Sequence, residues 1–119
     1  TFGPAELPVA ALQSLEGDSD IRGAVVYDYE AGQGHFFGFN FQPASDRNYK
    51  LWVLDANGKA ISAQVVQVDP TSGRGSAIIA FPEDVAAMKE IVVTLEEDEG
   101  AATPSAQVQL RSPVEPKQL

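Results

Sequence analysis

One histidine, His35, limits the catalysis that this sequence can support. A metal site built from several imidazoles is excluded, and a Ser-His-Asp triad would have to use this single ring. His35 directly follows the turn glycine Gly34, where a polar side chain that faces solvent is expected. No serine lies in a G-x-S-x-G motif that would mark it as a nucleophile. We therefore predict that the domain is not an enzyme, with hydrolysis through His35 as the alternative.

Carboxylates are abundant, but their spacing is not diagnostic of a site. The run EEDE at 96–99 could supply oxygen ligands to calcium, although it lacks the spacing of an EF-hand loop. A solvated acidic loop is the simpler interpretation, and calcium binding at 96–99 stays open. The G-x-G at 32–34 joins two predicted strands without a following helix, so it does not form a phosphate cradle. The sequence thus predicts no cofactor.

The charge balance excludes several kinds of partner. Asp and Glu total 17 against 8 Lys and Arg, so the formal net charge is -9. Such a surface would repel nucleic acid and anionic membranes. The chain has no cysteine, which excludes disulfides and thiolate metal sites, and no run approaches the ~20 apolar residues of a membrane span. Because the first residue is Thr1, we expect the chain to be part of a longer protein whose signal or anchor lies outside it.

Most of the chain shows the period-two alternation of β-strands. Turn-forming residues separate the predicted strands, which cover 9–16, 22–30, 35–41, 48–55, 60–69, 76–81, 90–96 and 105–111. A short helix is expected after Pro82, with acidic residues in its first turn. No helical pattern long enough for an α/β fold lies between the strands. The pattern predicts an all-β protein, an antiparallel β-sandwich of about seven or eight strands with one short helix.

The length fits one domain with loosely structured ends. Residues 1–8 are expected to form an N-terminal linker or membrane-proximal segment, and residues 9–112 the β-sandwich. Prolines at 113 and 116 predict a flexible tail over residues 113–119.

The only tryptophan lies on a predicted strand that is apolar on both faces. The alternation places two sets of residues on opposite sides: Tyr49, Leu51 and Val53 against Trp52 and Leu54. A central strand covered on both sides has this pattern, which favours Trp52 as a core residue. The alternative is an exposed aromatic platform that uses Tyr29 and Trp52 to bind carbohydrate or another ligand.

Two short patterns predict backbone irregularities. Asn57-Gly58 tolerates positive φ at both positions, which favours a type I′ hairpin turn. The adjacent residues Val65 and Val66 shift the alternation of their strand, which predicts a β-bulge there.

The alternation also predicts which side chains share a face. Phe37, Phe39 and Phe41 fall on one face of their strand, and packing explains most aromatics in such positions. Near the C-terminus, Val108 and Leu110 are expected to point inward.

Two sequence blocks carry a family resemblance. The first is a Tyr-x-Leu-Trp-Val strand, a glycine turn and a Ser-Ala pair, formed by Tyr49, Leu51, Trp52, Val53, Gly58, Ser62 and Ala63. The second is the block VVTLEEDEGAATPSAQVQL, with Thr94, Leu95, Glu96, Gly100 and Pro104 in register. Together they resemble the C-terminal extracytoplasmic domain of the anti-sigma-K factor family, and the resemblance extends from about residue 21 to 111. The chain departs from the family pattern at Glu97, where proline is usual, and at Gln64, where glycine is usual.

The resemblance implies a role in transcription regulation without catalysis. It implies a single-pass membrane protein whose cytoplasmic part, absent from this chain, binds a sigma factor. This domain would then lie outside the membrane, in the periplasm or at the outer face of the cell, and would take part in signal transduction. Release of the sigma factor would follow regulated proteolysis, with a protease or periplasmic protein as partner. The motif residues would be structural, and no catalytic, cofactor or metal residue comes with the resemblance.

Overall fold

Nine strands and one short helix make up the part of the chain that the computed structural model describes, which is residues 9–14, 20–42, 48–97, 104 and 108–113. The strands are β1 (Val9–Ser14), β2 (Arg22–Asp28), β3 (Gln33–Phe39), β4 (Asn48–Leu54), β5 (Ala60–Val65), β6 (Gln67–Val68), β7 (Gly75–Ala80), β8 (Glu90–Glu96) and β9 (Val108–Pro113). The helix is a single 3₁₀ turn, η1 (Val85–Ala87). Each predicted strand is present, and the helix after Pro82 is confirmed as a shorter element.

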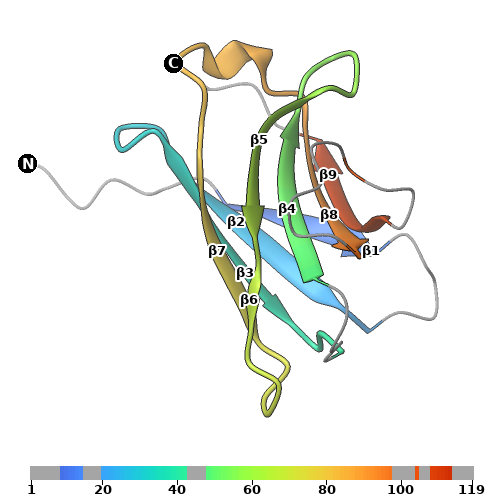
Figure 1. The fold of residues 1–119 in the computed structure, drawn as a ribbon. Helices are drawn as coiled ribbons and strands as arrows, with labels where there is room; N and C mark the ends of the chain where they lie inside the picture. The colour runs from blue at the N-terminus through green and yellow to red at the C-terminus, as the bar shows by residue number, and fades with distance from the viewer. Residues whose placement is uncertain (1–8, 15–19, 43–47, 98–103, 105–107, 114–119) are drawn as a thin grey trace, which may run out of the picture.

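The strands form two antiparallel sheets that pack face to face (Figure 1). One sheet has the order β1-β2-β3-β7-β6 and the other the order β5-β4-β8-β9. The predicted all-β sandwich is therefore confirmed. The strand count is nine because one predicted strand, 60–69, is divided into β5 and β6.

Two segments link the sheets by changing from one to the other. Residues Val9–Leu12 of β1 pair with β2, whereas Gln13 and Ser14 pair with β9. On the opposite side the chain leaves β5, passes Val66 and enters β6 on the other sheet, as the continuous ribbon in Figure 1 shows. Hydrogen bonds of β1 thus close one seam of the sandwich, and the covalent chain joins the sheets at the other.

The break at Val66 replaces the bulge that the sequence predicted. The Val66 N–H donates to the carbonyl of Tyr49 at 2.8 Å, so this residue stays tied to β4 while the chain turns toward β7. The irregularity in the β4–β5 ladder lies instead between Val53 and Leu54. The shift in alternation at Val66 therefore marks a change of sheet. When the chain crosses from β5 to β6, the opposite side of the strand comes to face the core, so the apolar positions move by one residue.

The glycine turn between β4 and β5 also differs from the prediction. Gly58 has φ +77°, but among the described non-glycine residues only Asn40 has a positive φ, so Asn57 does not form a type I′ turn. The Asp55 carboxylate accepts hydrogen bonds from the N–H groups of Asn57 and Lys59 at 2.8 and 2.9 Å. This side chain stabilises a turn in which the glycine alone takes the left-handed conformation.

The main core lies between the sheets and contains Phe36, Phe41 and Tyr49 in edge-to-face contact. The predicted common face of Phe37, Phe39 and Phe41 is wrong, because Phe37 and Phe39 are 48% and 50% exposed whereas Phe41 is buried. Asn40 has φ +68°, which interrupts the strand geometry and returns Phe41 to the core. The inward phenylalanine of β3 is instead Phe36, which is fully buried.

A second apolar cluster lies on the face of the β4–β8–β9 sheet that points away from the main core. Trp52, Leu54 and Val92 form it, and Val108 packs against them. The predicted inward orientation is therefore right for the fully buried Leu110 and wrong for Val108. The β8–β9 register shifts between Val93 and Thr94, and this shift places the two residues of β9 on different faces.

Candidate functional site

Four polar or amphipathic side chains of β4 and β8 form a buried group around the tryptophan. Lys50 pairs with Thr94 across the ladder, and Trp52 and Glu96 lie two residues further along their strands. Lys50, Trp52, Thr94 and Glu96 are 8%, 1%, 0% and 4% exposed. We call this set the Trp52 cluster.

Two hydrogen bonds of the Trp52 cluster form a chain from Trp52 through Thr94 to Glu96. The Trp52 indole N–H donates to the Thr94 hydroxyl at 2.8 Å, and that hydroxyl donates in turn to the Glu96 carboxylate. The Lys50 ammonium lies 4.8 Å from the centre of the Trp52 ring, a distance at which a cation and an aromatic face attract. Each polar group therefore meets a specific partner, as buried polar groups must if burial is not to cost stability.

The hydroxyl of the Trp52 cluster is closed to a substrate. A threonine hydroxyl beside a carboxylate could serve as a nucleophile with a base, but Thr94 has no exposed surface through which a substrate would reach it. The cluster connects residues 42 positions apart in sequence and fixes the register of two neighbouring strands.

Both motif blocks of the sequence meet in this part of the fold. Tyr49, Leu51 and Val53 face the main core from β4, while Trp52 faces the second cluster. The Tyr49 hydroxyl donates to the carbonyl of Gln42 at 3.2 Å, and burial raises the pKa of this phenol. The remaining described positions are Gly58 in the turn after β4, Ser62 and Ala63 on β5, Leu95 on β8, and Pro104 between β8 and β9 in the sequence. Gly100 lies outside the described residues.

His35 has surroundings that do not suit a catalytic base. Its Nε2 lies 2.9 Å from the side-chain amide nitrogen of Gln33. Its cross-strand neighbours are Val26 on β2 and Ile78 on β7, and neither can orient an imidazole or act as a nucleophile. The hydrolase alternative therefore receives no support from the residues around His35.

Loop carboxylates serve as turn caps. The Asp69 side chain accepts a hydrogen bond from the Thr71 N–H at 2.9 Å, and this bond, assisted by Ser72 and Arg74, lowers the pKa of Asp69. Within the described ranges no group of three or more His, Cys, Asp or Glu side chains could hold a metal ion. Of the acidic run 96–99, Glu96 is buried in the Trp52 cluster and the last two positions lie outside the described residues.

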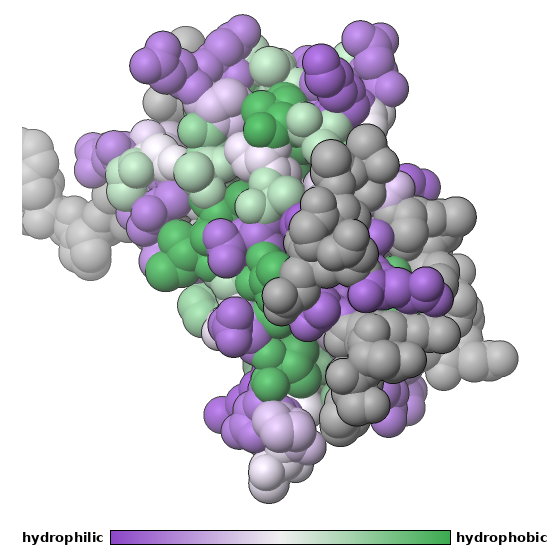
Figure 2. Space-filling model, viewed as in Figure 1, coloured by the Kyte–Doolittle hydropathy of each residue, from purple (hydrophilic) through white to green (hydrophobic). Residues whose placement is uncertain are grey.

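A second region of interest is the outer face of the β1-β2-β3-β7-β6 sheet. Among the residues whose side chains are described, Phe37, Phe39 and Ile78 are the large hydrophobic residues exposed there, with 48%, 50% and 55% of their surfaces accessible. We call these three residues the outer apolar surface. Figure 2 shows hydrophobic side chains reaching solvent on the side of the molecule where β5, β6 and β7 run in Figure 1.

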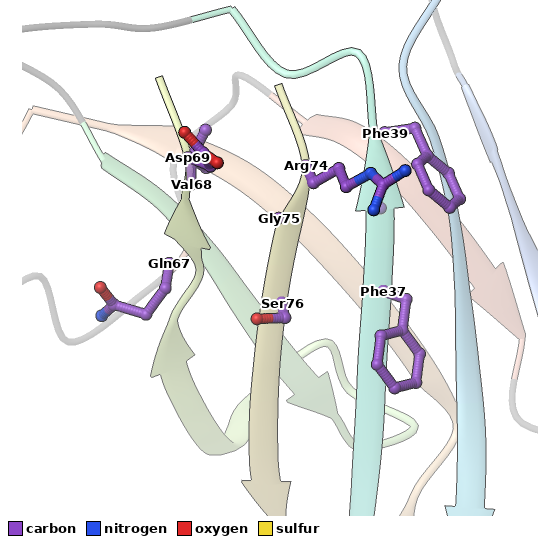
Figure 3. A pocket seen from close by; sticks show the side chains of 9 residues that line it. Phe37, Phe39, Gln67, Val68, Asp69, Arg74, Gly75 and Ser76 are labelled. Carbon is purple, nitrogen blue, oxygen red and sulfur yellow. The ribbon is translucent and has the colours of Figure 1, made fainter. Parts of the chain in front are cut away.

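A groove of ≈ 690 Å³ lies beside Phe37 and Phe39. In Figure 3 both rings stand on the same side of β3, and the side chain of Arg74, the residue before β7, extends toward Phe39. Gln67, Asp69 and Ser76 add polar groups to the rim of this groove. Such a combination of aromatic faces and hydrogen-bonding groups can hold a ligand that has apolar and polar sides.

Sequence reasoning missed the outer apolar surface, although a signal for it existed. In QGHFFGF of β3, the inward positions are Gly34, Phe36 and Gly38. A Cβ atom on Gly34 would lie 2.8 Å from the buried ring of Phe81. The inward face of β3 therefore needs glycines, because large core rings pack directly against it. Phe37 and Phe39 consequently lie on the outer face.

Where the structure describes the chain, none of its helices has the length and hydropathy to span a bilayer. Comparison with protein families gives a match over most of the chain. The model of the family "anti-sigma-K factor RskA, C-terminal" matches residues 3–110, nearly the whole chain. Neither a search of curated proteins nor a search of solved structures finds a match.

Proposed function

The chain belongs to the family of anti-sigma-K factor RskA C-terminal domains, and we propose that it is the extracytoplasmic sensory domain of a membrane-anchored anti-sigma factor. Family membership assigns the protein to anti-sigma regulation, with a sigma factor as the partner of the whole protein. The proposal adds the location outside the membrane and the control of sigma release by regulated proteolysis. Residues 1–8 would then connect the sandwich to the membrane anchor.

The observation that carries the proposal is the family match over residues 3–110. The fold supports a gating role because its core is continuous and β1 spans both sheets. A folded sandwich resists proteases until it opens locally, so a signal that opens it or removes a partner would expose new cleavage sites. A domain of this kind can control proteolysis without catalytic residues of its own.

The Trp52 cluster would set how readily the domain opens. It includes Trp52 and Thr94, one from each motif block, and it lies across the β4–β8 ladder. We propose that the motif residues of both blocks are structural and that those on β4 and β8 hold these two strands in register. Loss of the cluster would raise the population of open forms that a protease can cut.

The first test is the gene itself. A coding sequence upstream of Thr1 that contains an apolar segment of ~20 residues would support membrane anchoring. An upstream sequence without such a segment would remove the basis for an extracytoplasmic location.

The second test measures regulation in cells. Full-length anti-sigma factor with Trp52→Ala should be degraded faster and should raise transcription from a sigma-dependent reporter in the absence of signal. Gln64→Ala, at an exposed position of β5 outside the motif residues, is the matched control and should behave like the wild type. Equal anti-sigma half-lives and equal reporter activities for all three proteins would contradict control by domain opening.

A ligand-binding module is the second candidate, with different residues from those that the sequence suggested. Trp52 is buried and Tyr29 stacks on Tyr27 at 5.9 Å, so neither forms an open platform. Phe37 and Phe39 instead flank the ≈ 690 Å³ groove, and about half of the surface of each residue is exposed. Signals on a glycan array that disappear in Phe39→Ala, with the melting temperature unchanged, would favour this function. Identical arrays for the two proteins would exclude it.

A further inference from the structure

The ladder on one side of β7 ends halfway along the strand. β6 pairs with β7 only through Gln67 with Ser76 and Val68 with Gly75. Beyond Ser76 the chain of β6 has already passed into β5, which belongs to the other sheet. In Figure 1, β5 and β7 lie together near β6 and diverge from there. Among the described residues, no strand pairs with Ala77–Ala80 on the side opposite β3.

The register of the β3–β7 ladder identifies which backbone N–H and C=O groups of β7 point away from β3. The Phe81 N–H donates to the Gly32 carbonyl, so these two residues form a hydrogen-bonded pair. Ile79 and Gly34 pair two residues earlier on β7 and therefore form the next hydrogen-bonded pair of the β3–β7 ladder. In an antiparallel ladder the hydrogen-bonded pairs alternate with non-bonded pairs, so Ile79 bonds to β3 whereas Ile78 and Ala80 direct their N–H and C=O groups away from it. Ile78 and Ala80 therefore form a short, open template for another strand.

The sequence of β7 does not protect this edge. The strand reads GSAIIA, without a charge or a proline, although edge strands in natural proteins are commonly blocked by such residues. Ile78 is the most exposed large hydrophobic residue described, at 55%. A groove of ≈ 430 Å³ adjoins the edge, with Gln64 and Val65 of β5 on one side and Ala77 and Ile78 of β7 on the other.

We propose that Ala77–Ala80 of β7 binds an extended segment of a partner protein by strand addition. The unpaired N–H and C=O groups require an extended backbone, and the exposed Ile78 side chain beside Phe37 favours apolar residues at alternate positions of the segment. The partner segment is neutral or basic, because the formal net charge of this chain is -9. The same charge disfavours a second copy of the chain as the occupant.

The inference does not depend on the proposed function, since the open edge follows from the register alone. Its test uses the peptide KVTVTVK, acetylated and amidated, and the ¹⁵N-labelled 119-residue chain. Binding should shift the amide resonances of Ile78 and Ala80 and slow their hydrogen exchange. A peptide with proline in place of its central valine should not bind, because proline removes a donor and disrupts the extended pairing.

Variants of the protein locate the site. Ile78→Pro removes an N–H that does not bond to β3, so binding should weaken about tenfold or more from the loss of one or two backbone hydrogen bonds. Ile78→Thr keeps the N–H and a β-branched side chain and should retain affinity within about threefold. If Ile78→Pro does not fold, Ala80→Pro tests the second outward N–H in the same way.

Three kinds of result would overturn the proposal, from the peptides, from the mapping and the protein variants, and from the oligomeric state. The first is that KVTVTVK does not bind the wild type, or that the proline-containing peptide binds equally well. The second is that the shifted resonances map away from β7, or that both folded proline variants bind like the wild type. The third is concentration-dependent dimerisation in sedimentation equilibrium that Ile78→Pro abolishes, which would assign the edge to a second copy of the chain.

Discussion

The indole N–H of Trp52 donates to the hydroxyl of Thr94 at 2.8 Å across the β4–β8 ladder. The Thr94 hydroxyl donates a second hydrogen bond to the Glu96 carboxylate, so one hydroxyl is both acceptor and donor. This relationship ties the two sequence blocks that carry the family resemblance into one buried structure.

Replacement of Trp52 measures how much the buried ring stabilises the fold. Trp52→Ala should lower the free energy of unfolding by about 3 to 5 kcal/mol, because it leaves a cavity beside Leu54 and Val92. Trp52→Phe keeps a ring and removes the N–H donor, so its cost should be smaller, about 1 to 3 kcal/mol. Urea denaturation followed by circular dichroism gives both values. An unchanged melting temperature for Trp52→Ala would contradict its burial.

Replacement of Thr94 tests whether the hydrogen bonds act together. Thr94→Val keeps the branched shape and removes the hydroxyl that joins Trp52 to Glu96, so unfolding should become easier by about 1 to 3 kcal/mol. Combined with Trp52→Phe, it completes a double-mutant cycle, in which residues of one hydrogen-bonded network should show a coupling of about 0.5 to 3 kcal/mol. Strictly additive effects would show that the Trp52–Thr94 hydrogen bond makes no net contribution to stability, because both replacements remove that bond.

A substitution at Gly38 tests how tightly the Phe41 ring packs against β3. A Cβ atom added at Gly38 would overlap the Phe41 ring, which is buried and cannot move freely. Gly38→Ala should therefore destabilise the domain by about 1 to 3 kcal/mol through overpacking. Gly32→Ala is the control: nothing lies within 4 Å of its added Cβ, and its cost comes only from φ +68°. Recovery of stability in Gly38→Ala combined with Phe41→Leu would confirm that the ring is the obstacle.

The lowered pKa of Asp69 predicts that the domain loses stability at acid pH. Hydrogen bonds from Thr71 and Ser72 lower the pKa of Asp69 below its ordinary value of 3.8. The stabilisation from the charged form is present above pH 3.8 and is lost as the pH falls from there through the lowered pKa of the folded state. Asp69→Asn keeps an acceptor oxygen but does not titrate, so the wild type should lose stability relative to this variant between about pH 4 and about pH 2. Parallel stability curves in this range would show that the pKa of Asp69 is not lowered.

The strand positions could be predicted from sequence because alternation is a local property of an extended backbone. Each predicted strand is present, and Trp52 is buried on a strand covered from both sides. The side chains of β3 could not be assigned in the same way, because both faces of HFFGFNF are apolar. Alternation defined its two faces, but only the packing of Phe81 and Phe41 against the glycines decided which face is inside.

The family membership and the all-β architecture were determined by the sequence itself, because motif order and strand periodicity are both written along the chain. Only the tertiary structure decided that Val66 marks a change of sheet, that Val108 packs beside Trp52, and that half of β7 has an open edge. Those features depend on which strands lie side by side. Such pairings join residues far apart in sequence, as Trp52 and Thr94 do, so local patterns do not determine them.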